Sequence, residues 1–183
     1  MDLIRTALWR RLDVPGYDAA TVSQTAQGYE LFGQCVFMDS RGPTALRYVL
    51  ALKSDWSIVE GRVTGFIGER SIDAHIVRSP EGWTLNGINY GWAEVVDLDL
   101  SFTPATNMLQ LKRTSPAINE AADFDVVWLE AGKEELQRLP QQYRRISELE
   151  YDYNAPTVGY HATIVLAPSG FAAVYPSLWE IVR

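Results

Sequence analysis

Hydrophobic and polar residues alternate along most of this 183-residue chain, which is typical of strands that bury one face. Residues 44–53 show the pattern most clearly, because Leu46, Tyr48, Leu50 and Leu52 alternate with polar or smaller residues. Similar segments recur at short intervals: 29–38, 58–66, 71–78, 121–129, 141–153, 157–166 and 171–175. The pattern predicts an all-β protein of roughly a dozen short antiparallel strands, arranged as a sandwich or a barrel.

Turn residues separate these segments. Asn86-Gly87 is the strongest hairpin signal, because both residues tolerate the positive φ of a two-residue turn. Residues 133–139, which end at Pro140, are the one segment predicted to be helical. Residues 17–26 are mixed and polar, which indicates an edge strand. Neither a linker nor an internal repeat interrupts residues 1–183, so we expect a single domain.

Residues 95–113 carry the densest polar pattern, and we interpret them as two strands around a turn. Asp97 and Asp99 alternate with leucines, so both carboxylates share one face of the first strand. In the second strand, Asn107 and Arg113 would lie at the two ends of an apolar face. This arrangement fits a ligand pocket or a polar-capped sheet, and the residues alone leave both open.

Composition narrows the class of protein. A net charge of −7 argues against binding to nucleic acid or to anionic membranes. The chain has no run of about 18 apolar residues and no recognisable signal peptide, so we expect a cytoplasmic protein without integral membrane association. Its 6 Trp and 9 Tyr suit either a β core or an aromatic-lined cavity. The single cysteine, Cys35, lies in an apolar run and is expected to be buried.

Few residues offer catalytic or metal chemistry. His75 and His161 lack companions at ligand spacing, so we assign them structural roles and expect neither a metal nor a cofactor. Asp97 and Asp99 could act as an acid and base pair, as in glycoside hydrolysis. The simpler interpretation is that they face solvent or pair with arginines, the candidates being Arg113, Arg144 and Arg145.

Several short motifs nevertheless resemble the bacterial family named "putative glycolipid-binding", in the same order from about Trp9 to Arg183. These motifs are Leu46-Arg47-Tyr48, Asp55-Trp56, Val96-Asp97-Leu98-Asp99-Leu100, Thr103-Pro104-Ala105-Thr106-Asn107, Gln142-Tyr143-Arg144-Arg145 and Tyr175-Pro176-Ser177-Leu178-Trp179. The resemblance implies one antiparallel sheet curled into a half-barrel around an apolar cavity, similar to lipoprotein localisation factors. The chain departs from the family pattern at Gln110, where a proline is expected, and at Pro168, where an aspartate is expected.

Together these features predict a non-enzymatic binding protein for an amphiphilic small molecule, such as a glycolipid or an acyl compound. Asp97, Asp99, Asn107, Arg113 and Tyr143 are the candidate ligand-binding residues. One alternative is a hydrolase that uses Asp97 and Asp99 with His161 nearby. Another is a scaffold whose sheet edge or apolar patch binds a second protein. The pattern carries no signal for an oligomeric state.

Overall fold

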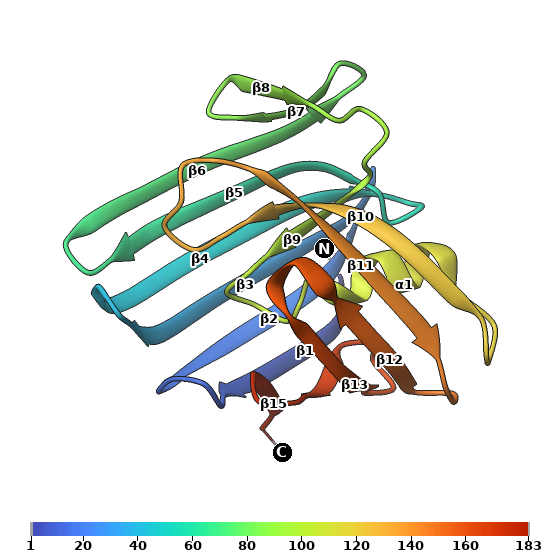
Figure 1. Ribbon diagram of the computed structural model, residues 1–183. Coiled ribbons are helices and arrows are strands. Elements are labelled where there is room, and N and C mark those ends of the chain that lie inside the picture. The colour runs from blue at the N-terminus through green and yellow to red at the C-terminus, as the bar shows by residue number, and fades with distance from the viewer. Residues whose placement is uncertain (1, 183) are drawn as a thin grey trace.

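The computed structural model describes residues 2–182 and contains one large sheet of 15 strands (Figure 1). The first part is a meander in which each strand pairs with the next. Its strands are β1 (Asp2–Arg11), β2 (Gly16–Thr25), β3 (Gly28–Asp39), β4 (Gly42–Lys53), β5 (Ile58–Ile67), β6 (Arg70–Ser79), β7 (Gly82–Leu85) and β8 (Ile88–Gly91). The β7–β8 hairpin forms one edge of the sheet and projects at the top of Figure 1.

The second part joins the first through β15, which pairs with β1. Its strands are β9 (Asp97–Leu100), β10 (Ala121–Leu129), β11 (Gln137–Arg145), β12 (Glu150–Ala155), β13 (Tyr160–Leu166), β14 (Ala172–Tyr175) and β15 (Trp179–Ile181). All neighbouring strands are antiparallel except β9 and β10, which run parallel. The helix α1 (Asn107–Thr114) follows β9, and a short 3₁₀ helix η1 (Pro156–Val158) follows β12.

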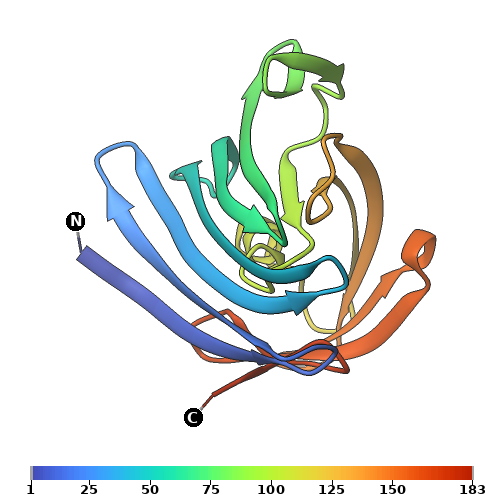
Figure 2. The same ribbon diagram turned by 90° about the vertical axis from the view of Figure 1, so that its left-hand side faces the viewer.

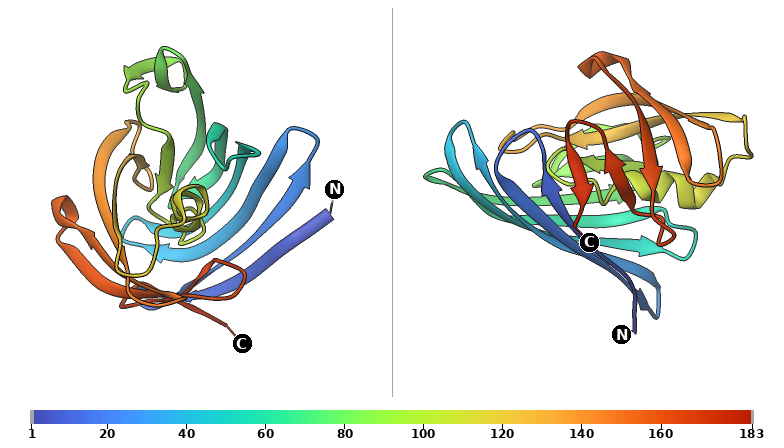
Figure 3. Two further views of the ribbon diagram at one scale, coloured as in Figure 1. Left: turned by 90° about the vertical axis from the view of Figure 1, so that its right-hand side faces the viewer. Right: turned by 90° about the horizontal axis from the view of Figure 1, so that it is seen from below.

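The sheet curls without closing into a barrel, and β9 and α1 lie inside the curl (Figures 2 and 3). The all-β class predicted from the pattern and the single curled sheet implied by the family resemblance are therefore confirmed, whereas the sandwich or closed barrel that the pattern suggested is not formed. β4 spans the predicted strand 44–53. Asn86 and Gly87 form the predicted hairpin turn with φ values of 50° and 83°. Within residues 2–182, no helix has the length and apolar character needed to cross a bilayer.

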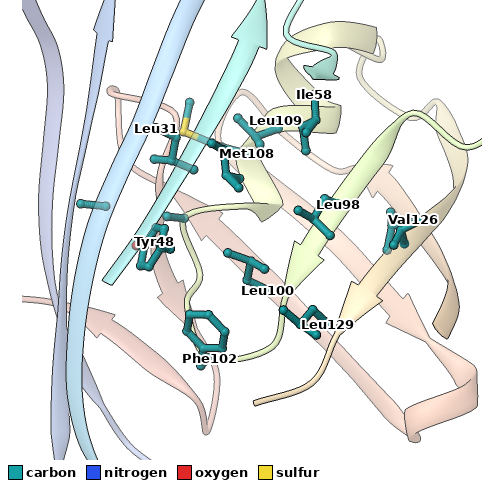
Figure 4. Packing of buried hydrophobic residues seen from close by; sticks show 14 of the residues in the cluster. Leu31, Tyr48, Ile58, Leu98, Leu100, Phe102, Met108, Leu109, Val126 and Leu129 are labelled. Carbon is teal, nitrogen blue, oxygen red and sulfur yellow. The ribbon is translucent and has the colours of Figure 1, made fainter. Parts of the chain in front are cut away.

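The core occupies the concave side of the sheet. Figure 4 shows Leu98 and Leu100 of β9 between residues of the meander, such as Tyr48, and residues of β10, such as Val126. The leucines and the aspartates of β9 thus point to opposite sides of the strand, as the sequence predicts. Its leucines pack toward the meander, where Leu98 lies beside Gly61, while its aspartates point toward α1 and β11. Both faces of β9 are therefore buried, although it is an edge strand that pairs with β10 on one side.

Two segments differ from the sequence prediction in their secondary structure. Residues 107–113 form a helix and not a strand, because the curl encloses α1 and buries residues 107–111 without regard to alternation. Residues 133–139 are not helical, since β11 begins at Gln137 and pairs with β10. The buried residue Leu136 lies in the connection before β11, and the buried residue Leu139 lies in β11.

Residues 17–26 were expected to form an edge strand, which is also wrong. β2 pairs with β1 on one side and β3 on the other, so it lies inside the sheet. Its polar residues are tolerated because Asp18, the most buried of them, forms hydrogen bonds with Tyr48 and Thr103. A buried polar strand therefore resembled an edge strand in the sequence.

Trp9 lies at the seam between the two parts, where β1 meets β15. Three residue pairs join β1 to β15, and backbone hydrogen bonds from Leu12 to Leu178 and from Val182 to Leu8 extend the junction. Trp9 is fully buried, and its indole Nε1 donates a 2.6 Å hydrogen bond to the carbonyl of Ala172 in β14. Its ring also meets Phe171 edge to face, with centroids 5.1 Å apart. One side chain on β1 therefore contacts the second part beyond the strand that pairs with it.

Candidate functional site

A cavity of about 280 Å³ opens on the inner side of the second part. Most of its lining residues come from β9 to β15 and the loops between them. They are Asp99, Ser101, Thr103, Asn107, Trp128, Leu139, Tyr153, Val158, Tyr160, Tyr175, Leu178 and Trp179. A larger hollow of about 490 Å³ lies near Arg10, but surface side chains such as Tyr17, 53% exposed, line it. The smaller cavity is the better candidate site, because it combines an apolar lining with a few buried polar groups.

Aromatic rings form one wall of this cavity. Tyr153, Tyr160 and Tyr175 contact one another, with ring centroids between 5.3 and 5.9 Å apart. The Tyr160 hydroxyl donates a 2.6 Å hydrogen bond to the carbonyl of Pro176, which holds that ring in place. Trp128 of β10 and Trp179 of β15 complete the wall. The sheet pairing brings these five rings together from five strands.

Asp99 is the acidic group of the cavity. The residue is 7% exposed, and its Oδ2 accepts a 2.7 Å hydrogen bond from Nε2 of Gln141. Burial raises the pKa of Asp99 to about 6. The other carboxylate oxygen, Oδ1, has no hydrogen-bond partner among the described residues. It is not fully buried, and Asp99 lines the cavity, so Oδ1 faces the cavity.

Amide side chains hold the groups around Asp99. Gln141 accepts a 2.9 Å hydrogen bond from Nε2 of Gln110 in α1, which fixes the orientation of both amides. Asn107 donates a 3.0 Å hydrogen bond to the hydroxyl of Tyr143. Strand β11 therefore positions both Asp99 and Asn107 through side chains that point into the curl, and α1 completes this polar layer.

A second buried network fixes the loop between β9 and α1. The Thr103 hydroxyl donates a 2.5 Å hydrogen bond to Asp18, and the Tyr48 hydroxyl lies 3.0 Å from the same carboxylate. Burial raises the pKa of Asp18 to about 6, although both hydroxyls oppose the shift. The backbone N–H of Ala105 donates to Thr103. A Cβ at Gly33 would overlap the Tyr48 ring, so glycine there makes room for the network.

The five ligand-binding residues predicted from the sequence occupy two places. Asp99 and Asn107 line the cavity, and Tyr143 supports Asn107 from behind. Asp97 and Arg113 instead form an ion pair of 2.5 Å beside a separate hollow. The structure thus brings three of the five residues together. It also identifies the partner of Asp97 from the three arginines considered.

The histidines lie away from the cavity lining. Both histidine side chains are exposed: His161 Nε2 is 2.7 Å from Asp152, and His75 Nε2 is 2.6 Å from Glu60. His161 is therefore paired with a carboxylate other than Asp97 or Asp99. Nowhere in residues 2–182 do three or more His, Cys, Asp or Glu side chains gather as a metal site. Cys35 is buried, as predicted.

The aromatic wall was not predicted from the sequence. Tyr151 and Tyr153 share one face of a strand and alternate with polar residues, so an inward ring was a readable signal. Tyr175 and Trp179 belong to a motif of the family resemblance, but no ligand role was assigned to them. Their convergence depends on the order in which β12 to β15 pair, which alternation within one strand does not specify.

The cavity carboxylate makes stability depend on pH. The pKa of Asp99 is higher in the folded state than in the unfolded state. The stability that this group contributes is therefore fully present below about pH 4 and is lost as pH rises through 6. A change from about 4 to about 6 corresponds to roughly 2–3 kcal/mol. Asp99→Asn keeps an acceptor for Gln141 and removes the charge. We expect it to unfold at higher urea than the parent at pH 7.5 but equally at pH 4; equal midpoints at both pH values would contradict this.

Taken together, the molecule is an open half-barrel whose concave side holds a helix, a packed core and one aromatic cavity with a buried acid. This chain belongs to the family described as "Putative glycolipid-binding", whose model matches residues 6–181. The resemblance seen in the sequence is thereby confirmed. The fold is also that of a DUF1089 family protein from Pseudomonas aeruginosa, with a TM-score of 0.77 and 21% identity over 90% of this chain and 91% of that one. No curated protein matches the chain.

Proposed function

We propose that this protein binds an amphiphilic small molecule, such as a glycolipid, without transforming it chemically. The observation that carries the proposal is the cavity, in which five aromatic rings face a buried carboxylate and an amide. Aromatic side chains offer large apolar surfaces, while Asp99 and Asn107 offer hydrogen-bonding groups. A molecule with both apolar and polar parts would satisfy both. The description of the family agrees with this class of ligand.

The dimensions of the cavity indicate how much of the ligand it holds. At about 280 Å³ it is close to the lower end of the range for small-molecule pockets. It therefore suits one end of an amphiphile, and the remainder would extend over the rim. Val158, which is 47% exposed, and Leu178 line that rim and provide apolar contact. Each buried CH₂ group would contribute about 0.8 kcal/mol.

The direct test is native mass spectrometry of the protein purified from its own host, followed by denaturation and lipid extraction. A bound amphiphile present in equal molar amount would support the proposal and give the class of ligand. If the protein is empty, titration with decyl maltoside below its micelle concentration, followed by tryptophan fluorescence, provides the second test. Trp128 and Trp179 line the cavity and would report occupancy. The absence of a bound amphiphile in the first experiment, together with no saturable fluorescence change in the second, would refute the proposal.

Blocking the rim should abolish binding without unfolding the protein. Val158 is exposed and lines the cavity, so the indole of Val158→Trp would fill space that the ligand needs. We expect at least a tenfold loss of decyl maltoside affinity, equivalent to about 1.4 kcal/mol. Val36→Trp is the matched control, because Val36 is 55% exposed on β3 and does not line the cavity. Equal affinities of the two variants would place the ligand elsewhere.

A hydrolase is the second candidate, and one observation favours it. A carboxyl group whose pKa is raised in a cavity is a common feature of catalytic sites, and Asp99 has this property. The two-acid mechanism needs Asp97 as well, but Asp97 pairs with Arg113 and does not line the cavity. Binding therefore has the stronger support. Release of nitrophenol from nitrophenyl glycosides by the parent, and not by Asp99→Asn, would favour catalysis.

A further inference from the structure

We infer that the end of the ligand that enters the cavity carries a positive charge, as in an alkylammonium or trimethylammonium group. This inference rests on the proposed function and specifies its ligand class. Two features of the described residues support it independently. One is an acid that faces open space without a cationic partner, and the other is the set of aromatic rings around that space.

The charge balance around Asp99 differs from that of the other buried acids. Asp97 is neutralised by Arg113, and Asp18 is sealed in the core, where two hydroxyls bond its carboxylate. Within residues 2–182 Asp99 forms no ion pair, and its one hydrogen-bond donor is the neutral amide of Gln141. A buried carboxylate is costly unless it is paired. A cationic ligand would supply the missing charge at Oδ1, which faces the cavity.

The aromatic wall strengthens the same preference. A cation is attracted to the face of an aromatic ring within about 6 Å of its centroid, and cages of such rings recognise quaternary ammonium groups. Tyr153, Tyr160 and Tyr175 pack against one another, and together with Trp128 and Trp179 they line the space that the charged end would enter. A carboxylate or phosphate ligand would be repelled by Asp99. A neutral sugar would leave the negative charge uncompensated.

The inference also predicts how binding depends on pH. Burial places the pKa of Asp99 near 6, so the carboxylate is mostly ionised at pH 7 and mostly protonated at pH 5. The titratable groups that face it are tyrosines 143, 153, 160 and 175, whose pKa values burial raises, so they stay neutral in this range. Asp97 and Arg113 on the adjoining elements pair with each other. No other residue that lines the cavity is titratable.

The test compares three amphiphiles with the same ten-carbon chain: decyltrimethylammonium, decyl maltoside and decanoate. Each is titrated below its micelle concentration into the full-length protein, with calorimetry as the readout. We expect decyltrimethylammonium to bind at least tenfold more tightly than the other two at pH 7, and about tenfold less tightly at pH 5 than at pH 7. Asp99→Asn should weaken its binding by roughly tenfold to a hundredfold, a clearly larger loss than the same variant causes for decyl maltoside.

Asp152→Asn is the matched control for overall charge, because it removes a partly exposed carboxylate that does not line the cavity. It should leave all three affinities unchanged. Tighter binding of decyl maltoside, or equal loss of decyltrimethylammonium affinity in both variants, would overturn the inference while the proposed function stands. If none of the three amphiphiles binds, the proposed function fails as well. Urea unfolding of each variant verifies that the protein remains folded.

Discussion

Trp9→Ala is expected to lower the free energy of unfolding by about 4 kcal/mol, the largest effect of a single substitution that we predict. Removing the indole leaves a cavity beside Phe171 and takes the hydrogen bond from the carbonyl of Ala172. Both losses fall on the seam, where three residue pairs connect β1 with β15. Urea unfolding followed by circular dichroism measures the change. A loss below about 1.5 kcal/mol would show that the seam does not depend on this ring.

Trp9→Phe separates the two contributions at this position. It keeps an aromatic ring against Phe171 but removes the indole N–H that bonds to Ala172. We expect it to cost about 1–3 kcal/mol, since the carbonyl loses a partner while most of the apolar contact remains. If Trp9→Phe were as damaging as Trp9→Ala, the hydrogen bond, and not the packing, would be the main stabilising contact.

Arg113→Met is expected to lower the free energy of unfolding by about 3 kcal/mol at pH 7, which is the second largest effect. The Asp97 side chain is 3% exposed and would remain buried without its partner. Burial already raises the pKa of Asp97, and losing Arg113 would raise it further. A raised pKa gives stability that is present at low pH and lost as pH rises. The deficit of the variant should therefore shrink as pH falls toward 4.

Two further variants test whether this cost comes from the unpaired charge. Asp97→Asn combined with Arg113→Met removes both charges and should recover at least half of the lost stability at pH 7. Arg144→Met breaks the ion pair between Arg144, whose side chain is 59% exposed, and Asp152, whose side chain is 30% exposed. It should lower the free energy of unfolding by less than about 1 kcal/mol. A constant deficit of Arg113→Met between pH 4 and 7 would mean that lost packing, and not charge, is responsible.

The strand pattern could be predicted from the sequence where one face of a strand meets the core. β4 is the clearest example, because its alternate residues are buried against the contents of the curl. The prediction fails for α1, where the surroundings bury Asn107 and Gln110 together with Met108 and Leu109. An element enclosed on all sides has no polar face, so its period is not visible in the sequence. Tertiary enclosure, and not local propensity, decided the helix.

The candidate site could be predicted only in part for a related reason. Asp99 and Asn107 were predicted to bind a ligand because they are polar residues within otherwise apolar segments. The aromatic rings were not assigned to the site, because Tyr153, Tyr160 and Trp179 are ordinary core residues when each is considered alone. Their arrangement depends on which strands are neighbours, and the link from β15 back to β1 joins residues that are distant in sequence. Such pairings leave no local pattern.

The seam also has a consequence for how the chain assembles. Each strand from β1 to β7 pairs with its immediate successor, so contacts in the meander are local and can form while the ribosome is still synthesising the rest. The hydrogen bond between Trp9 and Ala172 spans 163 residues and must wait until synthesis is nearly complete. During that interval the edge of β1 that later pairs with β15 has no partner strand, and the apolar inner face of the meander is exposed to solvent. We therefore expect the nascent meander to be the species that chaperones bind.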